Sequence, residues 1–348
     1  MLDTMAQPTS SNSTHTIRVP FADLRDRLTA ALLQLGFARE NAELCARLFA
    51  ETTLDGVYSH GLKRFPRFAA MVRSGLVQPN AVPERIAQCG SLERWDGRSG
   101  PGNLNAWRSM GRAIAIARDS GIGCVALANT NHWMRGGTYG WQAAKAGVIG
   151  ICWTNTMPNL PPWGGTRPTV GNNPLVLAVP RRDGHLVLDT AMSQFSYGAL
   201  ELYRDRGEML PVVGGFDGKG QLTCDPAAVE STQRPLPIGF WKGSGLAFIL
   251  DVISAVLAGG RATCEIADDP VRETAVTQIF LAIGCGGSFG RSPDEVAAAA
   301  IDFLKSSPAA PDAQIRYPGE QTLRIRAENL ARGVPVDRAL WESLASPS

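Results

Sequence analysis

The chain has 348 residues, of which 44% are hydrophobic and 19% charged, and its formal net charge is +2. This composition is typical of a folded globular protein and excludes a largely disordered chain. Because basic residues hardly exceed acidic ones, we expect neither nucleic acid nor an acidic membrane surface as a partner.

The seven cysteines are widely spaced and include no Cys-x-x-Cys pair. This spacing argues against a disulfide framework or a zinc knuckle and predicts reduced thiols in a cytoplasmic protein, with no metal site. Residues 1–17 are polar, which predicts a disordered tail and not a secretion signal. The longest apolar run, Leu246–Gly259, is interrupted by Asp251 and is shorter than the roughly 20 residues that cross a bilayer. It predicts a buried helix of a soluble protein, with no membrane partner.

Both ends of the chain have helical patterns. Apolar residues recur at helical spacing in Ala22–Leu35, and similar patterns cover Glu40–Leu54 and Arg64–Val72. Toward the other end, helices are predicted at Gln321–Arg332 and Val336–Leu344. We therefore predict that both termini belong to one discontinuous helical domain.

The middle of the chain has an α/β pattern. Helices are predicted at Trp107–Asp119, at Gly140–Ala146 and from Ser292 onward. Apolar segments typical of strands are found at Gly121–Asn129, Val148–Trp153, Leu175–Val179, His185–Leu188 and Thr274–Ile283. The Asp-Gly dipeptide at Asp183–Gly184 predicts a hairpin between two of these strands.

One segment, Gly121–Ala126, matches the letters of the dinucleotide-binding fingerprint G-x-G-x-x-A. That fingerprint requires a strand before the glycines and a helix after them, so that the pyrophosphate meets a helix N-terminus. Here the order is helix, glycines, strand. The segment is therefore predicted to be a helix end that leads into a strand, and a nucleotide would need a different fold.

Two histidines lie in settings that suit acid–base chemistry. His60 follows a helix and stands four residues before Arg64, which can hold a carboxylate while the imidazole moves a proton. His132 follows a predicted strand beside Asn131 and precedes Arg135 and two glycines. The alternatives are structural: a surface loop histidine in the first case and an ordinary polar turn in the second.

Two further positions suit ligand binding. Asp189 ends a predicted strand, where a carboxylate orients a histidine, binds a ribose or caps the next turn. Trp241 and Lys242 precede a helix predicted to start near Ser244, and a lysine beside the free amides of a helix N-terminus forms an anion site. A solvated lysine is the alternative.

Several long blocks together resemble the type-2 malate/lactate dehydrogenase family of NAD(P)-dependent oxidoreductases. The blocks are TTLDGVYSHGLKRFPRF (52–68), GIGCVALANTNHWMRGGTYGWQAA (121–144), GICWTNTMPNLPPWGG (150–165), GNNPLVLAVP (171–180), DTAMSQFSYG (189–198), LPVVGGFD (210–217), PIGFWKGSGLAFILD (237–251) and PGEQ (318–321). The family usually has His-Phe-Gly after Asn131. This chain has His-Trp-Met-Arg-Gly-Gly, the variant of the branch that reduces 2,3-diketo-L-gulonate. The resemblance fades at residues 284–291, which receive no role.

The resemblance implies an α/β (α+β), non-Rossmann NAD-binding fold. In such a fold a large, mostly antiparallel mixed sheet accompanies a discontinuous helical domain from both termini. It also implies a homodimer with the active site near the subunit interface. The predicted division is a disordered tail (1–17), a helical domain (18–78 and 308–348), an α/β core (79–120 and 245–307) and a cofactor- and substrate-binding α/β part (121–244).

The resemblance also implies which residues form the site. The general acid/base falls on His60, and the Asn-His pair of the strand-end motif falls on Asn131 and His132, which are predicted to bind substrate. The mechanistic hypothesis adds that Arg64 or Arg135 holds the substrate carboxylate, that Ser59 and Asn131 hydrogen-bond the substrate, and that Asp189 is a catalytic partner that tunes His60. Cofactor contacts fall on His185, Leu186, Val187, Leu188, Asp189, Thr190, Ala191, Trp241, Lys242, Gly319, Glu320 and Gln321.

The predicted reaction is an NAD(P)H-dependent reduction of a 2-oxo sugar acid, foremost 2,3-diketo-L-gulonate to 3-keto-L-gulonate. Hydride goes to the C2 carbonyl and His60 donates the proton. NADH is the predicted cofactor, and NADPH stays open. One alternative is a dehydrogenase for malate, lactate or ureidoglycolate, or a cyclic imino acid reductase. The alternative of another class is a non-catalytic protein that binds nucleotides or sugar acids.

Overall fold

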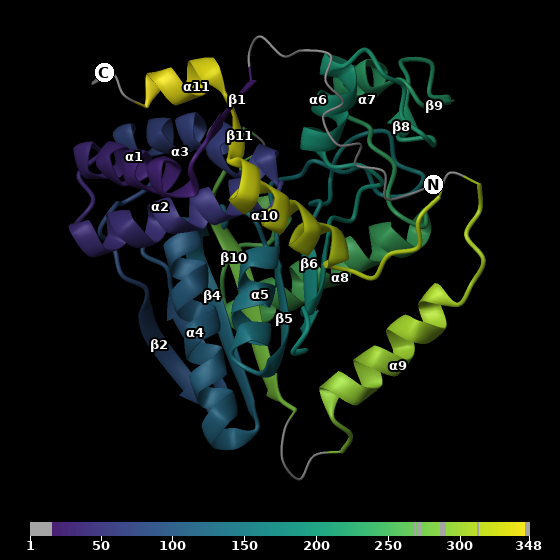
Figure 1. Cartoon of the computed structure of the whole chain (residues 1–348). Helices are drawn as coiled ribbons and strands as arrows, with labels where there is room; N and C mark the ends of the chain where they lie inside the picture. The colour runs from purple at the N-terminus through teal and green to yellow at the C-terminus, as the bar shows by residue number, and fades with distance from the viewer. Residues whose placement is uncertain (1–15, 268, 270–272, 286–289, 312, 345–348) are drawn as a thin grey trace.

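The computed structural model describes residues 16–267, 269, 273–285, 290–311 and 313–344 (Figure 1). All but the last two residues of the predicted tail lie outside the described residues, as does the middle of the 284–291 stretch. All seven cysteines are described, and all are free thiols.

A seven-stranded sheet forms the centre of the molecule, in the order β2-β3-β4-β10-β5-β6-β7. Among the described strands, β3 and β4 pair in parallel and every other neighbouring pair is antiparallel. This confirms the predicted mostly antiparallel mixed sheet. The strands are β2 (Glu84–Cys89), β3 (Leu92–Asp96), β4 (Ile122–Asn131), β5 (Val148–Thr154), β6 (Leu175–Val179), β7 (Leu186–Thr190) and β10 (Thr274–Gly284).

Helices cover both faces of this sheet. Successive side chains of a strand point to opposite faces, so each strand contributes to two apolar cores. Val125 and Phe280 face α4 (Gly102–Ser120) and α5 (Gly137–Lys145) in one apolar core. Their neighbours Ala126 and Ile279 face the end of α8 (Trp241–Ala258) in another. The sheet is thus the middle layer of three (Figure 1).

The two ends of the described chain meet. The strand β1 (Thr16–Val19) pairs antiparallel with β11 (Val334–Asp337). Around this pair lie the helices α1 (Phe21–Gln34), α2 (Arg39–Leu54), α3 (Phe65–Arg73), α10 (Glu320–Arg332) and α11 (Arg338–Ser343). The predicted division into domains stays a prediction.

The remaining elements are short or peripheral. The helix α9 (Pro293–Lys305) lies along the flank of the molecule (Figure 1). The others are α6 (Tyr197–Asp205), α7 (Pro226–Thr232), β8 (Gly215–Phe216), β9 (Leu222–Thr223) and 3₁₀ turns at Tyr58–His60, Leu62–Arg64 and Thr263–Glu265.

Most predicted helices and strands are confirmed within a few residues, but two expectations are wrong. The predicted helix Val336–Leu344 begins as strand β11, because its first residues pair with β1 across the whole length of the chain. The apolar helix α8 is also not buried within this chain: Phe248 is 58% exposed and Val256 is 74% exposed. By length and composition α8 is the one described helix that could cross a membrane. It packs along the sheet instead.

The Gly121–Ala126 segment is a helix end that leads into a strand, as predicted. Gly121 ends α4 in the left-handed region, with φ of 79°, and β4 starts at the next residue. A helix N-terminus is therefore absent from this glycine turn, and the segment cannot cradle a pyrophosphate in the Rossmann manner.

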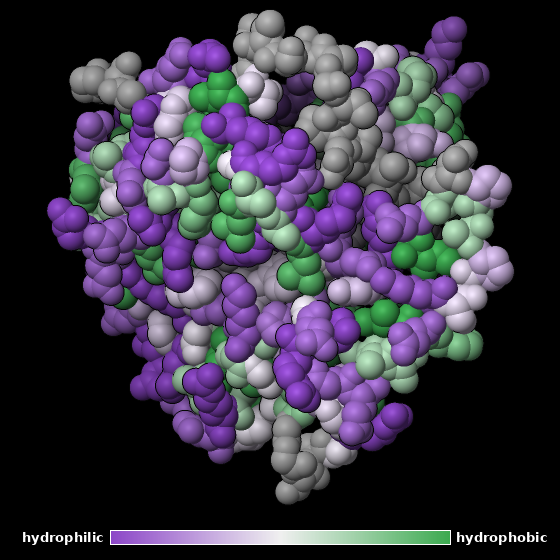
Figure 2. Space-filling view, in the orientation of Figure 1, coloured by the Kyte–Doolittle hydropathy of each residue, from purple (hydrophilic) through white to green (hydrophobic). Residues whose placement is uncertain are grey.

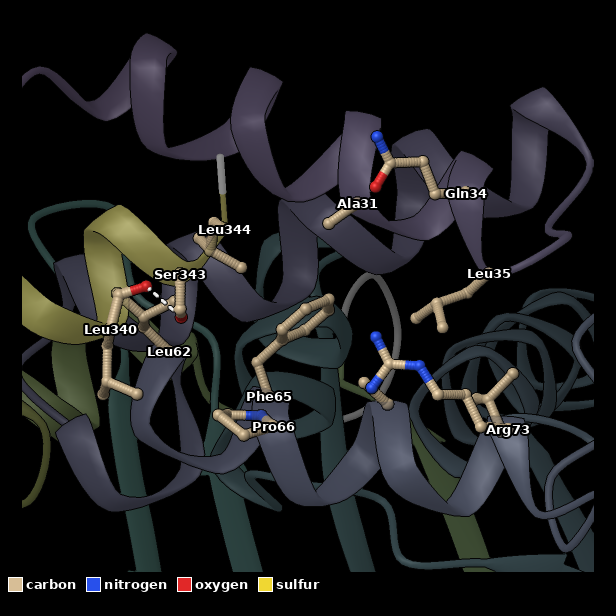
Figure 3. A pocket seen from close by; sticks show the side chains of 12 residues that line it. Ala31, Gln34, Leu35, Leu62, Phe65, Pro66, Arg73, Leu340, Ser343 and Leu344 are labelled. Atoms are coloured by element: carbon tan, nitrogen blue, oxygen red, sulfur yellow. Dashed lines mark hydrogen bonds between the residues drawn. The ribbon is translucent and has the colours of Figure 1, made fainter. Parts of the chain in front are cut away.

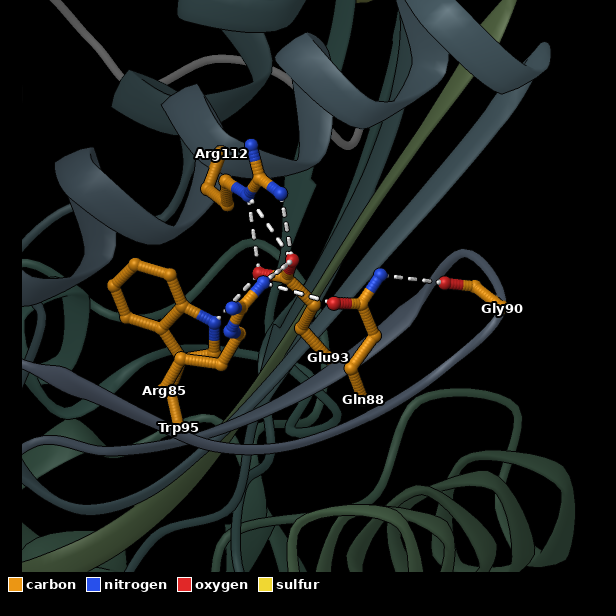
Figure 4. A network of polar contacts seen from close by, with 6 residues as sticks. All are labelled: Arg85, Gln88, Gly90, Glu93, Trp95 and Arg112. Atoms are coloured by element: carbon orange, nitrogen blue, oxygen red, sulfur yellow. Dashed lines mark hydrogen bonds and ion pairs between the residues drawn. The ribbon is translucent and has the colours of Figure 1, made fainter.

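A buried carboxylate braces the edge of the sheet (Figure 4). Glu93 on β3 is fully buried and receives hydrogen bonds from Arg112 at 2.7 Å, from Arg85 at 3.0 Å and from the Trp95 indole at 2.9 Å. These donors, Arg112 foremost, lower the pKa of Glu93 from 4.5 to about 2 although burial opposes them. The cluster ties β2, β3 and α4 together.

Candidate active site

His60 lies in a tight loop that turns back onto the end of α2. The loop needs Gly61, because a Cβ there would stand 2.3 Å from the Thr53 hydroxyl oxygen. That hydroxyl oxygen accepts the N–H of Leu62 at 2.9 Å. The glycine after His60 is thus explained by close packing, which fixes where the imidazole leaves the backbone.

The His60 ring is held on two sides. Its Nδ1 hydrogen-bonds the Ser59 hydroxyl at 2.9 Å. The ring of His132 stacks beside it, with centroids 5.8 Å apart and planes 18° apart. Since His132 Nδ1 accepts the N–H of Met134 at 3.0 Å, its neutral form carries the proton on Nε2. Within the described residues, His60 Nε2 has no hydrogen-bond partner and is left for a ligand.

Burial and positive neighbours keep both imidazoles neutral. Burial foremost, then the charges of Arg64 and Arg135, lower the pKa of His60 to about 4. Burial, Arg64, His60 and Arg67 lower the pKa of His132 well below its usual value. A bound carboxylate would offset the charge of Arg64 and raise the pKa of His60 again. We therefore expect the protonation of His60 to depend on anion binding.

The two predicted substrate arginines differ sharply. Arg64 is half-buried and donates no hydrogen bond to any other described residue. Burial and the charge of Arg67 lower its pKa to about 10, against the opposing effect of Glu273. Arg135 is 5% exposed, and its Nη1 lies 2.5 Å from Asp55 Oδ2. The geometry therefore favours Arg64 as the ligand of a substrate carboxylate.

Asp189 lies in β7 and faces the loop that carries Arg135. Its Oδ2 accepts the N–H of Gly137 at 2.7 Å. The side chain keeps exposed surface, yet the protein atoms packed around it raise its pKa, while Arg135 and the Gly137 N–H oppose the rise. Asp189 makes no hydrogen bond to His60, so the predicted tuning does not work by direct contact; Arg135 is the charge that influences both groups.

Asn131, the last residue of β4, fastens the neighbouring loop. Its amide nitrogen donates to the carbonyls of Ser99 and Gly100, each at 2.9 Å. Its buried amide oxygen has no partner among the described residues. A substrate role for Asn131, which stays a prediction, would fall to that oxygen.

The three predicted cofactor segments, far apart in sequence, lie side by side. The N–H of Val187 on β7 donates to Pro318 at 3.0 Å, just before Gly319. A Cβ on Gly319 would stand 3.1 Å from both the His185 carbonyl oxygen and the Val187 nitrogen. Beyond β7, the N–H of Ile238 donates to Met192 at 2.9 Å, three residues before α8 begins. The residues present therefore fit one extended ligand along the outer edge of β7.

The N-terminus of α8 differs from the expectation. The helix begins at Trp241 instead of near Ser244, and its first amides are not free. The N–H of Lys242 donates to Gly239 and that of Gly243 to Ile238. The exposed Trp241 indole and the Lys242 ammonium remain for a ligand, so an anion here would depend on the lysine.

The remaining cofactor candidates follow β7 and the start of α10. Leu186, Leu188 and Thr190 alternate along β7, where Leu188 is exposed. His185 Nδ1 accepts the N–H of Arg181 at 3.0 Å, which leaves Nε2 to donate. The partly buried residues Ala191, Glu320 and Gln321 continue the same edge.

Sequence reasoning missed the residues that surround Arg135 and Asp189. Asp55 binds Arg135 and is itself bound by Arg326, and the N–H of Gly137 donates to Asp189. Asp55 stands inside the block that carries His60, but an acid before a glycine at a helix end gives no signal of a distant partner. Arg326 lies on a helix at the opposite end of the chain.

A cavity of about 400 Å³ lies elsewhere, between α1, α3 and α11 (Figure 3). Most of the residues that line it are apolar, and Gln34 and Arg73 are polar members of the lining. None of the predicted site residues lines it. Leu62 and Phe65 connect it to the turn after His60, so it forms the back of that turn and not the site.

The chain is similar to known proteins along nearly its whole length. A family model described as malate/L-lactate dehydrogenase matches residues 19–345. Two relatives, each named 2,3-diketo-L-gulonate reductase, come from Citrobacter koseri and Pasteurella multocida and are 44% and 45% identical to this chain. These matches cover 94% and 95% of this chain and 99% and 100% of the relatives.

The likeness extends to solved structures. The structure of malate dehydrogenase from Pyrococcus horikoshii OT3 has a TM-score of 0.84 at 30% identity. The match covers 95% of this chain and 94% of that one. The similarity therefore concerns the whole fold and is not confined to one motif.

Proposed function

This chain belongs to the malate/L-lactate dehydrogenase family of oxidoreductases, and we propose that it reduces 2,3-diketo-L-gulonate to 3-keto-L-gulonate with NADH. The observation that supports this substrate is the 44–45% identity over nearly the full length of two relatives named for that reaction. Arg64 has no hydrogen-bond partner among the described residues and its charge acts on the His60 imidazole, which supports a 2-oxo acid as the substrate class.

In this proposal each residue near His60 has a separate task. Arg64 binds the carboxylate of the substrate, and the loss of its net charge raises the proton affinity of His60. His60 then donates a proton from Nε2 to the oxygen at C2, while Ser59 holds Nδ1 and His132 keeps the ring plane. A bound dihydronicotinamide would supply the hydride.

The outer edge of β7 is the proposed cofactor site. As an edge strand it offers backbone donors and acceptors, and Asp189 offers a carboxylate for a ribose hydroxyl. Gly319 lets the loop before α10 approach that strand closely. Lys242 and the Trp241 indole would hold a phosphate and an aromatic ring. The preference for NADH over NADPH rests on the family resemblance alone.

We also propose a homodimer, for which the exposed face of α8 is the argument. Trp241 is 66%, Phe248 58% and Val256 74% exposed, and Phe303 on α9 is 82% exposed. Hydrophobic side chains gather on the flank where α9 lies (Figure 2). Such patches mark protein–protein contacts. The unpaired thiols agree with the proposed cytoplasmic location.

A substrate panel tests the proposal. Purified protein is given NADH or NADPH with 2,3-diketo-L-gulonate, oxaloacetate, pyruvate or a cyclic imino acid, and loss of reduced cofactor is followed by absorbance. The proposal expects the highest kcat/KM for 2,3-diketo-L-gulonate with NADH. A higher value for another acid would assign the alternative substrate. Cofactor binding without turnover on any of them would favour the non-catalytic alternative.

A further inference from the structure

Asp55 holds two arginines from distant parts of the chain. It ends α2, and its carboxylate lies 2.5 Å from Arg135 Nη1 and 2.9 Å from Arg326 Nη1. Asp55 is 3% exposed and Arg135 5%, whereas Arg326 reaches the surface. A single buried carboxylate thus fixes the guanidinium of Arg135 from one side.

A second carboxylate lies on the other side of the same guanidinium. A Cβ on Gly137 would stand 2.8 Å from Asp189 Oδ2 and 3.3 Å from Arg135 Nε, so both side chains lie against this glycine. The Nε of Arg135 is buried and has no hydrogen-bond partner among the described residues. Asp189 instead accepts the backbone N–H of Gly137. Arg135 therefore lies near two acids, Asp55 and Asp189, and is bound to Asp55.

We propose that Asp55 is a positioning residue that holds the Arg135 guanidinium off Asp189 and so keeps the Asp189 carboxylate open to a hydroxyl of the bound ligand. The identity of that ligand as the cofactor rests on the function proposed above. Arg326 completes the arrangement, because it binds the second oxygen of Asp55 and fixes the carboxylate in one orientation.

The alternative is that Asp55 merely offsets a buried charge. The two possibilities differ in what happens when Arg135 is also removed. If Asp55 acts by restraining Arg135, its loss frees a cation that turns to Asp189, and removal of that cation reopens the site. If Asp55 only stabilises the fold, removing Arg135 as well does not restore ligand affinity.

The experiment is a double-mutant cycle read by cofactor affinity. NADH is titrated into the wild type, Asp55→Asn, Arg135→Gln and the double variant, with fluorescence as the signal and melting temperature as the check of folding. We expect about tenfold weaker binding for Asp55→Asn and recovery to within about twofold of Arg135→Gln in the double variant. Asp55→Glu, which keeps the charge, should retain most of the affinity. A double variant that binds no better than Asp55→Asn would overturn the inference.

Two further measurements separate this inference from the function. Glu93→Gln removes a carboxylate of the same kind away from the site and should leave NADH affinity unchanged. A crystal structure of ligand-free Asp55→Asn needs no cofactor: Arg135 bonded to Asp189 supports the inference, and Arg135 unmoved contradicts it. If the wild type binds neither NADH nor NADPH, the proposed function fails, while the crystal structure still decides the role of Asp55.

Discussion

Two buried carboxylates of this molecule, Asp55 and Glu93, each lie between two arginines, but their surroundings differ. The arginines of Glu93 are 48% and 39% exposed, and the cluster lies at the edge of the sheet (Figure 4). The Arg135 partner of Asp55 is buried and has Asp189 as a second acidic neighbour. Ion pairs of the same kind thus brace a strand in one place and, in our proposal, restrain Arg135 in the other.

The largest expected effect is the dependence of kcat/KM on pH, which should respond to charges near His60 and not to the Glu93 cluster. With the pKa of His60 lowered to about 4, the imidazole loses its proton as pH rises above that value. Reduction needs the protonated form, so its kcat/KM should fall about tenfold per pH unit between roughly pH 5 and 8. Oxidation of the hydroxy acid needs the neutral form and should stay level.

Two variants test whether the pH dependence of kcat/KM is set by the Asp55–Arg135 region and not by the Glu93 cluster. Arg135→Gln removes one of the charges that depress the pKa of His60, so its fall in kcat/KM should begin at higher pH. Glu93→Gln should leave the profile in place. A reduction rate that is level across this range in the wild type would exclude His60, in this environment, as the proton donor.

The next effect concerns the two arginines near His60. Arg64→Gln should raise KM for the 2-oxo acid about 100-fold, because charge-assisted hydrogen bonds worth roughly 3 kcal/mol are lost. Arg135→Gln should raise KM much less, since Asp55 already holds that guanidinium. Steady-state kinetics with saturating NADH measures both. Equal losses in the two variants would show that Arg135 also binds substrate.

Glu93 should matter for stability and not for turnover. A pKa lowered from 4.5 to about 2 corresponds to roughly 3 kcal/mol of folding free energy, which Glu93→Gln should remove at neutral pH. Because the folded-state pKa is lowered, this stability is present above pH 4.5 and is lost as pH falls toward 2. Denaturant unfolding of both proteins over that window checks the sign. A large loss of kcat/KM in this variant would refute the contrast with Asp55.

The smallest expected effect is at the glycine between Arg135 and Asp189. Gly137→Ala places a Cβ 2.8 Å from the Asp189 carboxylate and must displace it. Overpacking of this kind costs about 1–3 kcal/mol, so we expect NADH to bind on the order of tenfold more weakly. Gly111→Ala is the matched control, since its Cβ would meet one amide nitrogen at 3.4 Å. Similar affinity in the two variants would argue against Asp189 as a cofactor ligand.

The local parts of this picture could be predicted from the sequence. Apolar runs such as Val148–Trp153 became sheet strands, because strand formation there follows from residues close in sequence. His60 and Arg64 share one loop for the same reason. The helix before Gly121 predicted, from the order of elements alone, that this glycine segment does not bind a nucleotide in the Rossmann manner.

The predictions that failed depend on contacts between residues that are far apart in the sequence. Val336 joins a strand because its partner is residue 17, and no local pattern contains that pairing. Asp55, Arg135 and Arg326 meet across more than half of the chain. The exposure of α8 was missed because an apolar sequence does not tell whether the same chain or a partner covers it.

The decisive experiment is turnover by His60→Ala at saturating NADH and 2,3-diketo-L-gulonate, with NADH affinity measured on the same sample. If His60 donates the proton, kcat should fall about 10²- to 10⁴-fold while NADH binds as in the wild type. A His60→Ala protein that binds NADH and turns over at nearly the wild-type rate would contradict the proposed mechanism.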